Sequence, residues 1–249
     1  MSRSNEWRGP RSQGPAAVVL ACFMGLCGPG ARADADAAPA FKLTLGRYHY
    51  SDQGAGTDLN LRWRKDDNSL WVGHYRDPVF GSQARVGGDA SLDLGGDWSL
   101  QPSLQAATGG FVGGSVNLQW GSRWFGLLGW GRTNLRPYYN LNFDPNDALT
   151  LGAGLHDDHG GLWAVNWIAD DRLHTGQRHL HFSGRWTLAG RRVLVDLLRK
   201  TGQGDSGVVR AWGWTLGLDG QALFLRLARD PKQNFSSSDA TRLSLGLRF

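Results

Sequence analysis

The feature that most constrains this chain is an alternation of apolar and polar residues that recurs from Phe41 to the last residue. The final nine residues, TRLSLGLRF, show it most clearly. Side chains of an extended strand point alternately to opposite faces, so such a segment has one apolar face and one polar face. No stretch shows the 3.6-residue apolar period of an amphipathic helix. The alternation therefore predicts an all-β fold whose strands separate an apolar medium from water.

We expect about fourteen strands, with twelve to sixteen as the range, each bounded by residues typical of turns. They are expected at 41–50, 57–65, 69–77, 83–94, 98–108, 111–120, 124–135, 148–156, 162–169, 178–188, 192–200, 207–218, 221–229 and 241–249. Tight links are expected at 66–68, 95–97, 121–123, 189–191 and 219–220, and longer ones at 51–56, 136–147, 170–177, 201–206 and 230–240. An even count with tight turns at one rim and longer loops at the other is typical of a transmembrane β-barrel.

Alternation alone does not exclude a water-soluble β-protein with the opposite polarity. Several tryptophans, however, fall near expected strand ends, where an aromatic girdle at a membrane interface would lie. These candidate girdle residues are Trp63, Trp71, Trp98, Trp120, Trp124 and Trp163. Strands of about nine or ten residues, tilted by about 40°, span roughly 24 Å, which matches the apolar band of such barrels.

The C-terminal pattern of Leu243, Leu245, Leu247 and Phe249 resembles the assembly signal of Gram-negative outer-membrane β-barrel proteins. This resemblance concerns the class and no narrower family. It implies a single closed antiparallel barrel in the cell outer membrane. It also implies the barrel assembly machinery, outer-membrane lipid and lipopolysaccharide as partners.

The N-terminal segment 1–33 has the pattern of a secretory signal peptide, with arginines ahead of a short apolar stretch and an Ala31-Arg32-Ala33 cleavage pattern. That stretch, Ala16 to Cys27, is shorter than the roughly 20 residues of a membrane-spanning helix. A lipoprotein cleavage box ending at Cys22 is the alternative. We expect a short periplasmic lead-in at 34–40 and the barrel at 41–249.

Removal of segment 1–33 takes away both cysteines, so a disulfide or thiolate metal site is not expected in the remaining chain. The formal charge of the whole chain, +5, drops as well, because four arginines and the only glutamate lie in that segment. Nucleic acid is therefore not an expected partner. No phosphate loop, zinc motif or nucleotide fingerprint occurs, and no cofactor is expected.

The polar face is expected to line a lumen that is rich in arginine. The residues assigned to it are Arg62, Arg64, Arg85, Asp89, Asp93, Arg185, Asp196, Arg226, Arg242 and Arg248. One interpretation is a small-solute channel that favours anions, because fixed positive charge attracts them. The other is a structural or surface-interaction barrel whose arginines and aspartates pair across strands.

An enzymatic alternative comes from His181-Phe182-Ser183, which resembles the His-x-Ser element of outer-membrane phospholipase A and lipid A deacylases. His181 and Ser183 would share one face, and Asp196 on the next strand could orient the histidine. Those enzymes act on lipid from the outer wall, whereas here the pair lies on the polar face. They also have Asn-Gly after the serine, where this chain has Gly184-Arg185. We therefore expect a non-enzymatic barrel, with a lipid-acting hydrolase as the alternative.

Two loop segments contain metal-type ligands at short spacing. Asn142, Asp144, Asn146 and Asp147 form one group, and His156, Asp157, Asp158 and His159 form the other. Pro145 and a missing glycine break any calcium-loop spacing, and the second group lies in a tight polar turn. The sequence therefore predicts no metal site.

Overall fold

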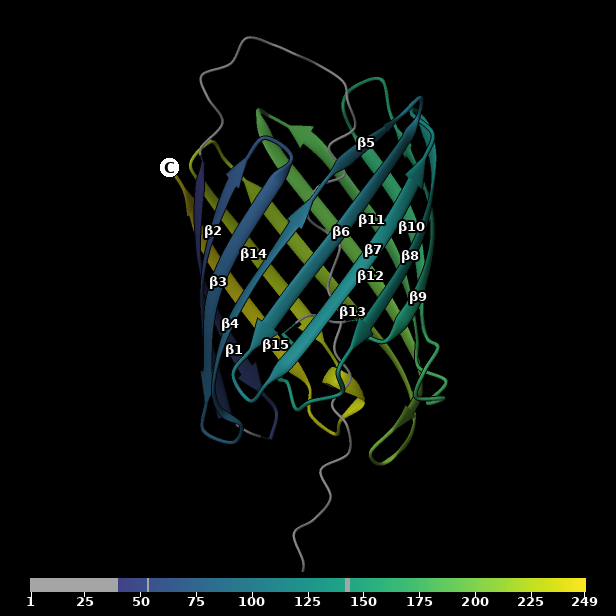
Figure 1. The fold of residues 1–249 in the computed structure, drawn as a ribbon. Helices are drawn as coiled ribbons and strands as arrows, with labels where there is room; N and C mark the ends of the chain where they lie inside the picture. The colour runs from purple at the N-terminus through teal and green to yellow at the C-terminus, as the bar shows by residue number, and fades with distance from the viewer. Residues whose placement is uncertain (1–39, 53, 142–143) are drawn as a thin grey trace, which may run out of the picture.

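The computed structural model describes residues 40–52, 54–141 and 144–249 and shows a closed antiparallel β-barrel (Figure 1). The expected signal segment 1–33, and the lead-in except for its last residue, lie outside the described residues. The elements are β1 (Phe41–Tyr50), β2 (Gly54–Lys65), β3 (Asn68–Asp77), β4 (Gly81–Ala90), β5 (Leu92–Gly95), β6 (Trp98–Ala107), β7 (Phe111–Trp120), β8 (Trp124–Thr133), β9 (Ala148–His156), β10 (Leu162–Asp170), β11 (Arg178–Leu188), β12 (Arg191–Gly204), β13 (Gly207–Asp219), β14 (Leu223–Asp230), the 3₁₀ turn η1 (Gln233–Phe235) and β15 (Ala240–Arg248).

Strands that follow one another in sequence are paired, except β4 and β5, and the pairing of β1 with β15 and of β4 with β6 closes the ring. β4 and β5 both pair with β6 and are two parts of one strand, interrupted at Ser91. The barrel therefore has 14 strands, as the sequence predicts. The bounds agree with the expected ranges to within a few residues, because turn residues mark most strand ends.

One rim has links of two to five residues, and the other has the three longest links, 134–147, 171–177 and 231–239. The former, here called the short-turn rim, is at the top in Figure 1, and the long-loop rim is at the bottom. The expected long links at 51–56 and 201–206 are wrong. β2 already begins at Gly54, which pairs with Tyr50. β12 continues to Gly204, which pairs with Gly207, so only Asp205 and Ser206 connect these strands. Continued backbone pairing extends this hairpin beyond the point where its apolar alternation ends.

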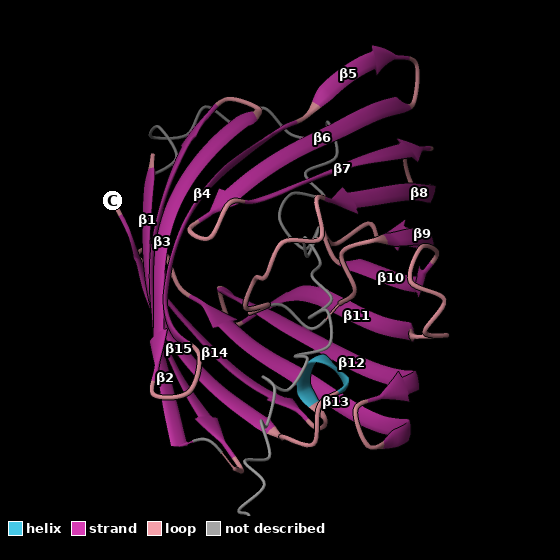
Figure 2. Cartoon of the chain, turned by 60° about the horizontal axis from the view of Figure 1, so that its bottom comes forward, coloured by secondary structure: helices cyan, strands magenta, loops and turns pink. Residues whose placement is uncertain are grey.

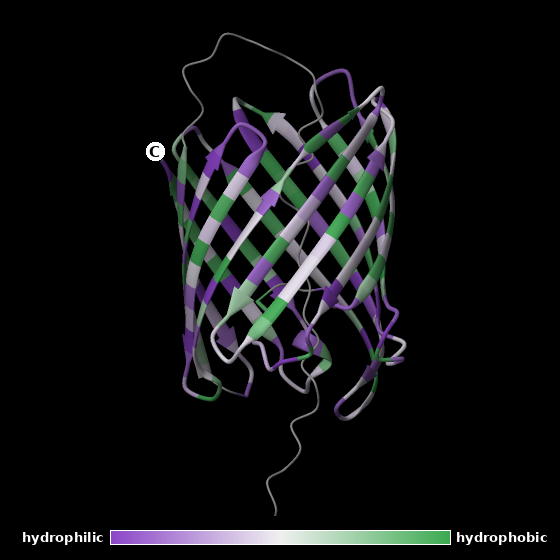
Figure 3. Ribbon diagram, in the orientation of Figure 1, coloured by the Kyte–Doolittle hydropathy of each residue, from purple (hydrophilic) through white to green (hydrophobic). Residues whose placement is uncertain are grey.

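The barrel is polar inside and apolar outside. Among the residues that the structure describes, 37 large apolar side chains are exposed, and more polar or charged residues are buried (23) than apolar ones (20). Figure 3 shows the two polarities alternating along each strand. A water-soluble barrel has the reverse arrangement, so the outer wall fits an apolar surrounding. No helix among the described residues is long and apolar enough to cross a membrane.

The C-terminal strand closes the ring against the first one. Phe41 and Phe249 exchange two backbone hydrogen bonds of 2.8 and 3.0 Å, and their rings stack with centroids 5.7 Å apart. Leu243, Leu245 and Leu247 are exposed on the outer wall, as is Phe249. The apolar face of the terminal pattern therefore belongs to the lipid-facing seam between β1 and β15.

Most of the expected girdle tryptophans lie on the outer wall. Those exposed there are Trp98, Trp120, Trp124 and Trp163, and half-buried Trp63 shares the outward parity of Leu61. Trp163 stacks on Trp186 at 5.3 Å and covers Gly184, where a Cβ would approach the Trp163 ring to 2.5 Å. The assignment of Trp71 to the girdle is wrong. It is buried on the inner wall beside Arg85, because odd-numbered residues of β3 point inward.

Candidate functional site: the barrel lumen

Segment 134–147, which links β8 to β9, folds into the barrel, and we call it the inward loop. Residues 142 and 143 of this loop lie outside the described residues. Figure 2, with the long-loop rim turned forward, shows loop segments inside the ring of strands. Tyr138, Asn140, Leu141 and Asp144 of the inward loop are all at most 5% exposed. A polar loop at this depth narrows the lumen and needs partners for its backbone groups.

Aromatic packing and amide hydrogen bonds hold the first half of the inward loop against the wall. Tyr139 stacks on Tyr75 at 4.6 Å, and Tyr138 stacks on Phe111 at 4.2 Å. Gln83 accepts a hydrogen bond from the Tyr139 backbone N–H at 2.8 Å and donates one to its carbonyl at 3.2 Å. This reciprocal amide pair fixes the loop to β4.

A second segment, 231–239 between β14 and β15, supports the inward loop from the long-loop rim. The side chains of Gln233 and Asn234 both donate to the carbonyl of Asn140, at 3.3 and 3.1 Å. Lys200 on β12 forms a fully buried ion pair with Asp230 and donates to the carbonyl of Lys232 at 2.9 Å. The two loops therefore form one hydrogen-bonded unit inside the long-loop half of the barrel.

The second half of the inward loop is attached to β11 through a buried cluster of two histidines and two aspartates. Oδ1 of Asp144 lies 2.9 Å from Nδ1 of His179 and 2.6 Å from Nε2 of His181. Nδ1 of His181 lies 3.0 Å from Oδ2 of Asp196 on β12. Burial by itself raises the pKa of the Asp144 carboxyl, but the facing His181 and His179 outweigh it and hold that pKa below its ordinary range.

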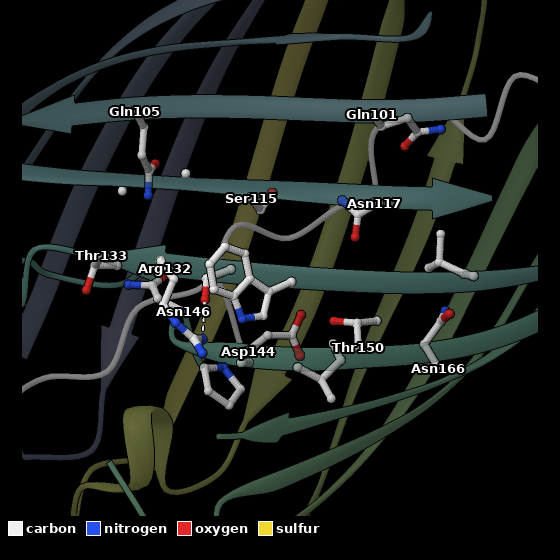
Figure 4. A pocket seen from close by; sticks show the side chains of 18 residues that line it. Gln101, Gln105, Ser115, Asn117, Arg132, Thr133, Asp144, Asn146, Thr150 and Asn166 are labelled. Atoms are coloured by element: carbon white, nitrogen blue, oxygen red, sulfur yellow. Dashed lines mark hydrogen bonds between the residues drawn. The ribbon is translucent and has the colours of Figure 1, made fainter. Parts of the chain in front are cut away.

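Two hollows adjoin the inward loop. The larger has a volume of about 620 Å³ and is lined by the inner faces of β1, β2, β4 and neighbouring strands, together with Tyr138, Leu141 and Asp144. The smaller, of about 60 Å³, lies between the loop and β6 to β10. Figure 4 shows its amide-rich lining, to which the loop contributes Asp144 and Asn146 and the wall contributes Asn117 and Asn166.

The lumen residues expected from the sequence point inward, but most of the arginines have polar partners. Arg62 lies 3.0 Å from Asp89, Arg85 pairs with Asp58, and Arg242 donates to the Leu141 carbonyl at 3.2 Å. Arg226 and Arg248 share the carboxylate of Asp219.

The remaining expected lumen residues differ in their surroundings. Arg64 and Asp196 line the larger hollow, and Arg185 shares the inward parity of His181. Asp93 sits in fully exposed β5 at the rim, where it accepts a hydrogen bond from the Gly95 backbone. The larger hollow is lined by six lysine and arginine residues and by six aspartates, so its formal charge is balanced overall.

Three cations are nevertheless grouped around one aromatic ring at the short-turn end of the lumen. Lys42 lies opposite Arg62 on one neighbouring strand and opposite Arg248 on the other. The buried ring of Phe224 has three cations over it: Lys42 at 4.4 Å, Arg248 at 4.9 Å and Arg226 at 5.3 Å. Like charges placed directly opposite destabilise a sheet. We call Lys42, Arg226, Arg248, Asp219 and Phe224 the cationic cluster.

Sequence reasoning missed Lys42 and Phe224. The position of Lys42 between Phe41 and Leu43 shows that it shares the polar face of its strand. Its proximity to Arg248 depends on ring closure, which no local pattern reveals.

The pair proposed for hydrolysis is not arranged as a nucleophile and its base. Both ring nitrogens of His181 lie beside carboxylates, those of Asp144 and Asp196. The hydroxyl of Ser183 donates to the Ala164 carbonyl at 3.5 Å. Nucleophile activation requires a base nitrogen directed at the serine, so this geometry does not favour the enzymatic alternative.

The other loop residues that could act as metal ligands stabilise their loops through hydrogen bonds. Asp147 accepts hydrogen bonds from Thr133 and Arg172, and Asp157 accepts them from the backbone of His159 and Gly161. Carboxylates used in this way stabilise turns without a cation.

No protein-family model matches the chain, and no curated protein sequence is detectably similar to it. Among solved structures, the outer membrane protein Omp33 of Acinetobacter baumannii has a similar fold, with a TM-score of 0.56, 10% identity, and coverage of 85% of this chain and 98% of that one. A KdgM porin (10% identity, 84% and 99% coverage) and a NanC porin (8%, 83% and 100%) each have a TM-score of 0.45. At these identities the similarity concerns the fold alone.

A closed antiparallel barrel with an apolar outer wall, a polar interior and an even strand count is a transmembrane barrel of the Gram-negative outer-membrane type. Its place is the cell outer membrane.

Proposed function

We propose that this barrel is a non-enzymatic channel for small solutes, with a preference for anions. The observation that supports it most strongly is the inward loop, which narrows a polar lumen without filling it. Most of the residues that line the hollow of about 620 Å³ beside the loop are polar or charged. An eight-stranded barrel can be filled by its own side chains, whereas this wider ring leaves space inside that a small solute could enter.

The anion preference rests on the cationic cluster. Its three cations are accompanied by one carboxylate, that of Asp219. This local excess of positive charge lies near one end of the lumen, and fixed charge along a conduit determines which ion accumulates there. The outward face of the barrel is proposed to contact outer-membrane lipid and lipopolysaccharide, and its terminal strand the barrel assembly machinery.

The test is single-channel conductance of protein refolded in planar bilayers, with and without the inward loop. We expect discrete openings, and we expect a larger conductance when residues 135–146 are replaced by a short Gly-Ser turn, because current rises with open cross-section. The matched control shortens the Asp157–Gly161 turn at the opposite rim, which does not enter the lumen. Refolded protein without any conductance, or equal conductance in all three forms, would contradict the proposal.

A further inference from the structure

Within the lumen, three metal-type ligand atoms from two separate elements converge on one point. They are Nδ1 of His179, Nε2 of His181 and a carboxylate oxygen of Asp144, and all lie within 4.8 Å of one another. The three residues are buried, with side chains at most 5% exposed. We propose that this cluster is a binding site for a divalent transition metal ion of the zinc type.

The spacing of the ligand atoms is close to what such an ion needs. Zinc bonds of about 2.0–2.2 Å in a tetrahedron put neighbouring ligand atoms about 3.3 Å apart. The Asp144 oxygen lies 2.6 and 2.9 Å from the two nitrogens, so entry of the ion requires a retreat of the carboxylate by less than about 1 Å. Asp144 belongs to the inward loop, whereas both histidines are fixed on β11. The group that must move is therefore on a loop, and the two histidines keep their places on a paired strand.

The surroundings of His181 match the outer sphere of a zinc site. Metal-bound histidines usually donate their second ring N–H to a carboxylate, which fixes the ring and strengthens the ligand. Asp196 lies 3.0 Å from Nδ1 of His181, on the side opposite to Asp144. His179 is held by stacking on Phe235 at 5.4 Å. Both rings are therefore oriented before any ion arrives.

The charge of the cluster and its access from the hollow both favour a zinc-type ion. Asp144 and Asp196 place two carboxylates around the site, and a divalent cation balances both. Two imidazole nitrogens select zinc-type ions over calcium or magnesium, which prefer oxygen ligands. Asp144, His181 and Asp196 all line the larger hollow, which gives the ion a path and leaves room for a water as the fourth ligand. A bound ion would join the inward loop to β11.

The test measures binding of Zn²⁺ to the refolded, untagged barrel by competition with a chromophoric chelator, so it does not depend on conduction. We expect one ion per chain, with binding abolished in His181→Gln and in Asp144→Asn. Asp196→Asn should weaken binding by about 10- to 100-fold, because it removes the group that orients His181. His159→Gln is the matched control. It removes a histidine from the turn that contains His156, Asp157 and Asp158, outside the proposed site, and should leave the affinity for Zn²⁺ unchanged.

Heat-modifiable migration on gels verifies that each variant is folded. If a variant does not fold, the visible spectrum of Co²⁺ bound to the unaltered chain still tests the proposal. Co²⁺ added to the unaltered barrel should give the intense visible bands of a four-coordinate site with nitrogen ligands. Stoichiometric Zn²⁺ binding that persists in His181→Gln, or that is lost in His159→Gln, would overturn the proposal. A folded chain that binds no Zn²⁺, or a weak six-coordinate Co²⁺ spectrum typical of oxygen ligands, would do the same.

Discussion

Asp219→Asn tests the role of the cationic cluster in ion selection. The carboxylate of Asp219 is the shared partner of Arg226 and Arg248, and its side chain is 12% exposed. The substitution keeps the shape of the side chain and removes one negative charge from the short-turn mouth of the lumen. The cluster then has three cations and no carboxylate of its own, so we expect a stronger preference for anions.

The size of the effect follows from Coulomb's law. One unit charge about 8 Å from an ion in water changes the energy of that ion by about 0.5 kcal/mol before screening. Screening with a Debye length of about 10 Å at 0.1 M salt leaves about 0.2 kcal/mol. Because the change has opposite sign for anions and cations, their permeability ratio should rise roughly twofold. At 1 M salt the Debye length is about 3 Å, and the change should nearly vanish.

The assay is the reversal potential in a KCl gradient, measured with low and with high salt. Asp158→Asn is the matched control, since Asp158 lies in a turn of the same rim but is 73% exposed and paired with exposed Arg123. It changes the net charge by the same amount away from the lumen and should leave the reversal potential unchanged. A shift of Asp219→Asn towards cations, or equal shifts in the two variants, would refute the reasoning.

Three further substitutions test the fold and the enzymatic alternative. Replacing both Leu247 and Phe249 with Asp should block membrane assembly while leaving export intact, because the β1–β15 seam loses its apolar face; normal insertion, measured by fractionation, would contradict this. Gly246→Ala should lower barrel stability by about 1–3 kcal/mol, because its Cβ would overlap the Phe224 ring. The control Gly46→Ala meets ordinary contacts of 3.4 Å or more and should leave the heat-modification midpoint unchanged. Ser183→Ala should change neither conductance nor stability, and lipase or deacylase activity that this substitution abolishes would contradict a non-enzymatic role.

Much of this protein is determined locally. Side chains alternate with period two, so the apolar pattern alone placed most strands and predicted the exposed face of Leu243, Leu245 and Leu247. Turn residues mark the strand ends, and the alternation of tight and long links assigned the two rims. Where the pattern is ambiguous, the sequence misleads: Leu70, Trp71 and Val72 are consecutive apolar residues, so alternation does not reveal that Trp71 faces inward.

The contents of the lumen were decided by tertiary structure alone. Asp144 lies 35 and 37 residues from its two histidine partners, and it meets them because its loop folds back into the barrel. Lys42 and Arg248 are neighbours because the first and last strands pair. Local periodicity sets which face of a strand is polar, but ring closure and loop return determine which polar groups meet. The charge distribution and the histidine cluster depend on those long-range contacts.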